Sequence, residues 1–178
     1  MALIPFKKAE RNSRRALTNE ELKKMLNRLN MDEFSAYKQT FLILLFFGLR
    51  PCELEDARFE GDFLIALNAK HKTSDGDKVY KKIPIPKQAR KYINVNEPIE
   101  CNCALDTLNR VFKRVMQDKE VTQYFLRHTF ATTCVQYVRP DIVDTWMGDS
   151  SERLVGRVYT HFPDKFMTNQ MDLVQFEF

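Results

Sequence analysis

An unbroken apolar run near residue 41 constrains the fold more than any other part of the chain. Seven consecutive apolar residues, 41–47, follow a more polar stretch that begins at Asp32 and precede Gly48. A helix over 32–47 would be apolar on more than one face, so other elements must surround it, and Gly48 is suited to end it. The run is too short to span a membrane, and the charged N-terminus does not resemble a secretory signal. We therefore expect a central core helix in a cytoplasmic protein.

Helical spacing recurs on both sides of a short segment with a strand pattern. Thr18 can cap a first helix, in which apolar residues recur at helical spacing. Residues 63–67 and 79–85 are typical of two strands, and 74–77 are turn residues that would join them. The later sequence predicts helices over 87–92, 104–118, 122–138, 140–147, around Tyr159, and over 164–174. The expected fold class is mainly α with a small antiparallel β-sheet.

Length and composition limit the classes of function. A chain of 178 residues, 44% of them apolar, forms one domain with a sizeable core. It has only five glycines and no Gly-rich loop for a nucleotide phosphate, and its four cysteines lack the spacing of a zinc site. We expect reduced thiols, no cofactor and no bound metal.

The net charge of +4 is distributed unevenly along the chain. Residues 1–15 contain five basic residues against one acidic residue, and residues 63–92 contain eight against two, whereas the remainder is acidic. Two concentrated basic blocks favour contact with a polyanion such as nucleic acid. The alternative is an ordinary solvated surface, and charge alone does not decide between the two.

Three short segments carry candidate chemistry. Arg50 lies in GLRPCEL (48–54), Arg127 lies in YFLRHTFAT (124–132), and Tyr159 lies in VYTH (158–161), shortly after WMGDSS (146–151). Guanidinium groups match phosphate oxygens, and a phenol can attack phosphorus to form a covalent bond. Two arginines and a tyrosine that converge in space would therefore suit phosphoryl transfer.

In this combination and order, the segments resemble the catalytic domain of the tyrosine recombinases, the phage-integrase family, over about residues 18–163. The resemblance implies that Tyr159 is the nucleophile and that Arg50 and Arg127 hold the phosphate. It also implies that a lysine of the β-hairpin is the general acid. Lys70 and Lys72 both fit and would point to the same face of an extended strand, and we favour Lys70.

Two positions depart from the family pattern. Tyr124 stands where the family usually has a histidine, and Asp149 stands where it usually has histidine or tryptophan. Tyr124 can still donate a hydrogen bond, but it is a poor general base at neutral pH. An ionised Asp149 would repel a phosphate unless it is protonated, neutralised by a nearby arginine or turned away. We expect activity to be retained, at a reduced rate.

The resemblance implies site-specific cleavage and rejoining of double-stranded DNA through a 3′-phosphotyrosyl intermediate, without metal or ATP. We expect an integrase of a phage or other mobile element that self-associates on its recombination sites. One alternative is a catalytically degenerate DNA-binding module of the same fold, for which Tyr124 and Asp149 argue. A second is an enzyme like the type IB topoisomerases.

The expected organisation is a basic linker or arm over 1–17, the catalytic domain over 18–163 and a C-terminal helix or tail over 164–178. Family members usually carry an N-terminal DNA-binding domain, so we expect this chain to be a catalytic-domain fragment or a truncated product. The apolar C-terminal tail could pass to a neighbouring protomer or pack on its own core, and the sequence favours neither.

Overall fold

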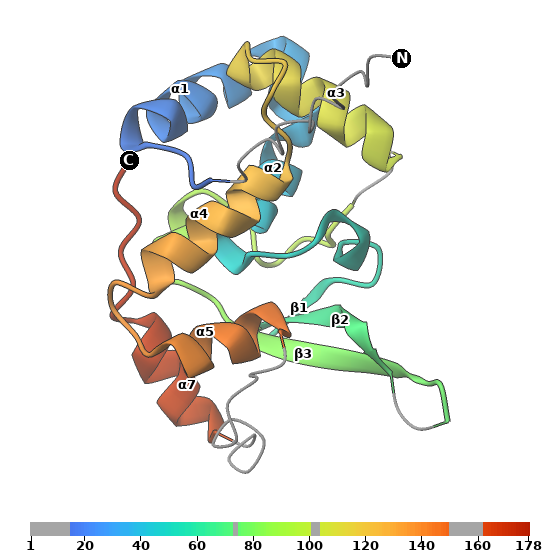
Figure 1. Cartoon of the computed structure of the whole chain (residues 1–178), viewed down its shortest axis with the longest axis vertical. Coiled ribbons are helices and arrows are strands. Elements are labelled where there is room, and N and C mark those ends of the chain that lie inside the picture. Colours follow the sequence, from blue (N-terminus) through green and yellow to red (C-terminus); the bar gives the residue numbers. More distant parts are fainter. Residues whose placement is uncertain (1–14, 73–74, 101–103, 150–161) are drawn as a thin grey trace, which may run out of the picture.

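The computed structural model describes residues 15–72, 75–100, 104–149 and 162–178. The chain is mainly helical with one three-stranded antiparallel sheet, as predicted (Figure 1). The α-helices are α1 (Asn19–Leu29), α2 (Asp32–Phe47), α3 (Leu105–Met116), α4 (Tyr124–Cys134), α5 (Pro140–Met147) and α7 (Asp164–Met171). Two short 3-10 helices are η1 (Pro51–Glu53) and η2 (Ala89–Lys91). None of the helices in the described ranges is both long and apolar enough to cross a membrane.

The apolar helix α2 forms the centre of the core. Its residues from Phe41 to Phe47 are fully buried, and it packs against α1 and α4 (Figure 1). Gly48 ends the helix with a φ of 58°, in the left-handed region that side chains with a Cβ disfavour. A Cβ at this position would also lie 2.4 Å from Phe130 Cδ1 in α4. Gly48 is thus required both by the backbone turn and by the close approach of α4.

The predicted start of α1 is confirmed. The Thr18 hydroxyl accepts a hydrogen bond from the Glu21 N–H, and the Glu21 carboxylate accepts one from the Thr18 N–H. This reciprocal cap satisfies two backbone donors that a helix start otherwise leaves free.

Several predicted helices are shorter in the structure. The prediction over 122–138 corresponds to α4, which ends at Cys134, because residues 135–137 turn toward Arg139, whose extended backbone precedes Pro140. The prediction over 164–174 corresponds to α7, which ends at Met171, and the one over 87–92 is only the 3-10 helix η2. The short helix predicted around Tyr159 lies outside the described residues.

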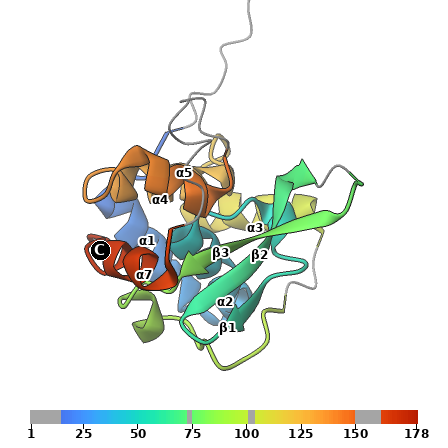
Figure 2. The same ribbon diagram turned by 90° about the horizontal axis from the view of Figure 1, so that it is seen from below.

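The sheet consists of β1 (Arg58–Glu60), β2 (Phe63–Lys72) and β3 (Lys78–Pro84), in that order. Its register pairs Leu64 with Ile83 and Ala66 with Lys81, and the β2–β3 hairpin extends beyond the helices (Figures 1 and 2). The sequence did not predict β1, which is three residues long. Pairing of β2 with β3 is irregular between Leu67 and Lys72, so β2 bulges there. Such bulges redirect side chains and are common beside functional sites.

The C-terminal tail packs against the core of its own chain. After α7 it runs back past α4 to the start of α1 (Figure 1). The Phe176 ring lies 5.0 Å from that of Phe46, measured between centroids. The Gln88 side chain donates a hydrogen bond to the Phe176 carbonyl and accepts one from the Phe176 N–H. Near the C-terminus, the Asn19 amide donates to the Glu177 carboxylate at 3.1 Å. Exchange of the tail between protomers stays a prediction.

Candidate active site

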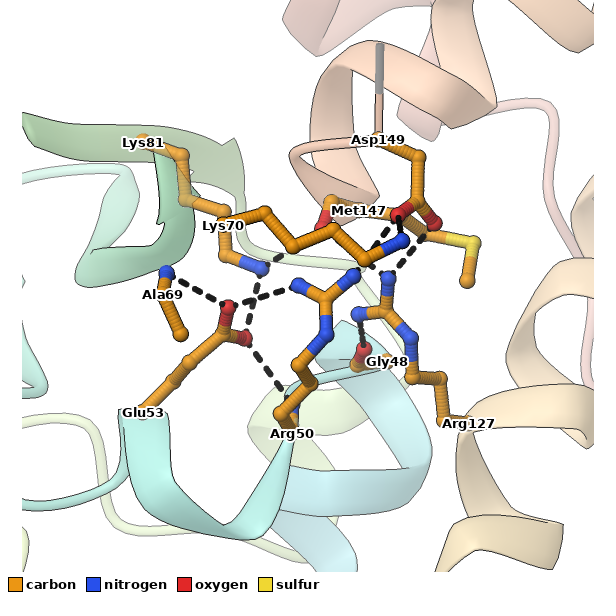
Figure 3. A network of polar contacts seen from close by, with 9 residues as sticks. All are labelled: Gly48, Arg50, Glu53, Ala69, Lys70, Lys81, Arg127, Met147 and Asp149. Atoms are coloured by element: carbon orange, nitrogen blue, oxygen red, sulfur yellow. Dashed lines mark hydrogen bonds and ion pairs between the residues drawn. The ribbon is translucent and has the colours of Figure 1, made fainter. Parts of the chain in front are cut away.

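Three cationic side chains from separate elements converge on the carboxylate of Asp149 (Figure 3). Arg50 Nη2 donates to Asp149 Oδ1 at 2.6 Å, and Lys70 Nζ donates to the same oxygen at 2.8 Å. Arg127 Nη2 donates to Oδ2 at 2.7 Å. The motif positions 50, 70, 127 and 149 therefore meet at one anion-binding position, although they are spread over 100 residues of sequence.

Arg50 is held by the first turn after α2. Pro51 begins η1, and Arg50 is the capping residue of that short helix. Glu53 Oε2 accepts from the Arg50 N–H and Glu53 Oε1 accepts from Arg50 Nη1, both at 2.9 Å. Because one carboxylate fixes both the backbone and the side chain of Arg50, its Nη2 is left to face Asp149.

Arg127 is held by backbone carbonyl groups. It lies in α4 with a buried side chain, and Nη1 donates to the carbonyl of Gly48. Nη2 donates to the carbonyl of Met147 at 3.1 Å in addition to Asp149. Burial and the nearby charge of Arg50 lower the pKa of Arg127 from its ordinary value, against the attraction of Asp149. The guanidinium remains a cation, since an arginine titrates far above neutral pH.

Lys70 reaches the site from the irregular part of β2. Its side chain is 60% exposed, so it forms the solvent side of the cluster, whereas Arg127 forms the buried side. The neighbouring Ala69 donates its N–H to Glu53 Oε1 at 3.2 Å, which ties the bulge to η1. Lys72 ends β2, and the choice of Lys70 over Lys72 as general acid stays a prediction.

Asp149 is placed by the end of α5. Gly148 adopts a φ of 67°, and the N–H groups of Gly148 and Asp149 return to the carbonyls of Thr145 and Asp144. A Cβ on Gly148 would lie 2.8 Å from the Asn68 side chain, so the turn also packs closely on β2. This glycine cap directs Asp149 back toward Arg127.

The Asp149 carboxyl group is ionised in this setting. Burial alone would raise its pKa, but the hydrogen bond from Lys70 and the charges of Arg127 and Arg50 lower the pKa to about 2. By sequence, Asp149 could avoid repelling a phosphate in three ways: protonation, neutralisation by an arginine, or a turn away from the site. The structure favours the second, because Asp149 faces the site as a carboxylate and is paired with Arg50 and Arg127.

No family model and no curated protein sequence matches the chain. Solved structures do. The XerH site-specific recombinase bound to its difH substrate aligns with a TM-score of 0.54 and 23% identity, over 83% of this chain and 50% of that one. The Tn1549 transposon integrase in complex with circular intermediate DNA aligns with a TM-score of 0.60 and 18% identity, over 93% and 67%.

A lambda integrase dimer bound to a core site gives a TM-score of 0.58 at 16% identity, over 82% of this chain and 62% of that one. The chain has the fold of a tyrosine recombinase catalytic domain. It spans between half and two thirds of the length of these three recombinases.

Of the two other motif residues that the sequence predicts for the site, the structure describes only Tyr124. Tyr124 is the first residue of α4, one turn before Arg127, and is 36% exposed. Tyr159, the predicted nucleophile, lies outside the described residues.

Sequence reasoning missed the role of Lys81. It lies in β3, and its Nζ donates to Glu53 Oε2 at 2.7 Å and to the Met147 carbonyl at 2.9 Å (Figure 3). Burial lowers the pKa of Lys81 to about 8, against the attraction of Glu53. A signal was present, because Lys81 occupies the strand face of Val79 and Ile83, where an alternating pattern calls for an apolar residue.

Proposed function

We propose that this chain is the catalytic part of an enzyme that cuts and rejoins DNA strands through a phosphotyrosine. The observation that carries the proposal is the convergence of Arg50, Lys70 and Arg127 on one carboxylate. A phosphodiester is an anion that two guanidinium groups and an ammonium group can hold in the same manner. The order of these residues along the chain also matches the recombinase motifs.

In the proposed reaction, Tyr159 loses its phenol proton to solvent, and its Oη attacks a DNA phosphorus and forms a 3′-phosphotyrosyl bond. The bond between phosphorus and the 5′ oxygen breaks, and Lys70 donates a proton to that oxygen. Arg50 and Arg127 hold the non-bridging oxygens and stabilise the charge that develops on them. A 5′-hydroxyl of a partner strand then attacks the phosphotyrosine and reverses these steps, so no external energy source is needed.

DNA as the substrate has independent support. The hairpin that carries Lys70 extends beyond the helices and belongs to the more basic of the two charged blocks. Each lysine or arginine that neutralises a phosphate releases counterions and favours binding. The XerH, Tn1549 and lambda structures named above are DNA complexes, and the lambda integrase is a dimer on its site. We extend to this chain both DNA binding and self-association on DNA, in a cytoplasmic enzyme of a mobile element.

The test is covalent trapping on a nicked suicide substrate, in which the cleaved end diffuses away and religation is prevented. The wild-type chain should form an adduct that survives denaturing electrophoresis. Tyr159→Phe should form none while it still retards the same DNA on a native gel. Tyr92→Phe, a matched loss of one phenol hydroxyl in the turn after η2, should form the adduct normally.

A catalytically degenerate DNA-binding module remains the second candidate, because Asp149 fills the anion position. It predicts that the wild-type chain binds the substrate but forms no adduct, so the same gels distinguish the two. An adduct that persists in Tyr159→Phe would reject Tyr159 as the nucleophile.

A further inference from the structure

We propose that Asp149 determines specificity by acting as an internal competitor for the phosphate position, excluding small phosphates and yielding to DNA. This inference rests on the proposed function, because it assumes that the arginine and lysine donors bind the reacting phosphate.

The first step of the argument is that the two occupants are mutually exclusive. Asp149 uses both oxygens: Oδ1 accepts from Arg50 and Lys70, and Oδ2 accepts from Arg127. The other terminal nitrogen of each guanidinium donates elsewhere, to Glu53 in Arg50 and to the Gly48 carbonyl in Arg127. Arg50 Nη2, Lys70 Nζ and Arg127 Nη2 all face one point, so a phosphate bound by these three donors takes the position that Asp149 now holds.

The second step is that the competitor is always present. The carboxylate is part of the chain, so its concentration at the site is set by the turn after α5 and does not fall on dilution. It also remains charged at any physiological pH, since its pKa is about 2. If the closed arrangement is populated at about 90%, the apparent affinity of any anion for the site falls about tenfold, and at about 99% it falls about a hundredfold.

The third step is that a duplex can bind in spite of this loss of affinity, whereas a free phosphate cannot. Inorganic phosphate that binds to the cluster has no contacts beyond it, so its affinity for this position falls by the whole factor. A duplex presents about one charge per 1.7 Å of its axis and can bind first through other basic residues. It can remain bound while the site is closed, and displacement of Asp149 then occurs within a complex already formed. The carboxylate is 27% exposed and Lys70 is 60% exposed, so the exchange can take place at the solvent side of the cluster.

The test is calorimetric titration with inorganic phosphate, in phosphate-free buffer of low ionic strength. We compare the wild-type chain of 178 residues with Asp149→Asn, which keeps the shape and removes the charge. The matched control is Asp141→Asn, which removes the same charge and breaks an Asp–Arg pair at the other end of α5. Asp149→Asn should bind phosphate at least tenfold more tightly than the wild type, and Asp141→Asn should stay within about twofold.

Equal phosphate affinities in Asp149→Asn and the wild type, or an equal gain in Asp141→Asn, would overturn the proposal. A measurement on the wild-type side chain covers the case in which Asp149→Asn unfolds. The ¹³C carboxyl resonance of Asp149 should shift when one equivalent of duplex is added and stay in place with one equivalent of phosphate. An unchanged resonance in the duplex-bound protein would also overturn it.

The phosphate titration involves neither DNA nor Tyr159, so its outcome is separate from that of covalent trapping. A gain in phosphate affinity in Asp149→Asn without any DNA adduct would reject the proposed enzyme and support competition by Asp149. An adduct without a gain in phosphate affinity would support the enzyme and reject the competition.

Discussion

The ammonium group of Lys81 lies 2.7 Å from a carboxylate oxygen of Glu53, and the two side chains are only 4% and 0% exposed. The pair joins β3 to η1, and the second hydrogen bond of Lys81 reaches the Met147 carbonyl at the end of α5. Glu53 also accepts hydrogen bonds from the N–H and Nη1 of Arg50 and from the N–H of Ala69, next to Lys70. The buried Lys81–Glu53 pair therefore holds Arg50 and β2 in place, although neither side chain contacts Asp149 itself.

Lys81→Met should lower the free energy of unfolding by about 3 kcal/mol, because it removes one of the two cations that contact the buried Glu53 carboxylate and leaves only Arg50. Lys82→Met is the matched control, since Lys82 is the next residue and forms an exposed ion pair with Asp164. Its effect should stay below about 1 kcal/mol. Urea unfolding of the two variants measures the difference, and similar losses would contradict the structural role of Lys81.

The pH dependence of the free energy of unfolding should show that ionised Asp149 stabilises the folded chain. Its pKa is about 2 in the folded chain and ordinarily 3.8, so the folded state favours the charged form. This contribution is complete above about pH 4 and is lost as the pH falls toward 2. After allowance for solvent screening, it amounts to about 1–2 kcal/mol.

Urea unfolding of the wild type and of Asp149→Asn at pH 5 and pH 2 measures that contribution. At pH 5 the wild type should be more stable than Asp149→Asn, and the difference between the two proteins should be smaller at pH 2. A difference that is independent of pH would show that Asp149 is not held by the three cations.

Gly148→Ala should cost more than Gly61→Ala. Both glycines have a positive φ, 67° and 58°, so each substitution incurs a left-handed strain of about 1–2 kcal/mol. Nothing lies within 4 Å of a Cβ at Gly61, whereas one at Gly148 would lie 2.8 Å from Asn68. The additional loss at Gly148 should be about 1–3 kcal/mol. Thermal unfolding of both variants measures it, and equal losses would mean that the turn can move away from β2.

Phe176→Ala should destabilise the chain by about 3–5 kcal/mol, because the ring is buried against Phe46. Leu173→Ala in the same tail is the control, since Leu173 is 51% exposed. A tail that packs on its own chain gives an unfolding temperature independent of protein concentration. An unfolding temperature that rises with concentration in the wild type and not in Phe176→Ala would instead indicate exchange of the tail.

Much of this fold and part of the site follow from local sequence patterns. The cap at Thr18 and the glycine that ends α2 depend on residues within one turn of the helix end, so the sequence predicts them well. The motifs also predict that Arg50 and Arg127 belong together. Convergence of these residues on Asp149 depends on the packing of α5 against β3, which no local pattern specifies.

The features that the sequence did not predict have specific physical reasons. Strand β1 has three residues and too little alternation to be recognised. The bulge in β2 arises from pairing across the hairpin, where Leu67 pairs with Tyr80 but Lys72 pairs with Lys78. Lys81 is one of eight basic residues over 63–92, and charge alone does not separate it from the others, whereas in β3 it lies on the same buried face as Ile83.

The carbonyl of Met147 receives hydrogen bonds from both Arg127 and Lys81. It belongs to the last turn of α5, where the unpaired carbonyls of a helix carry about half a negative charge. Unlike a carboxylate, this backbone dipole cannot be protonated or removed by substitution of a side chain. In the proposed exchange of Asp149 for a DNA phosphate, the helix end would continue to offset the positive charge, and the arginines would keep their orientation while one anion replaces the other.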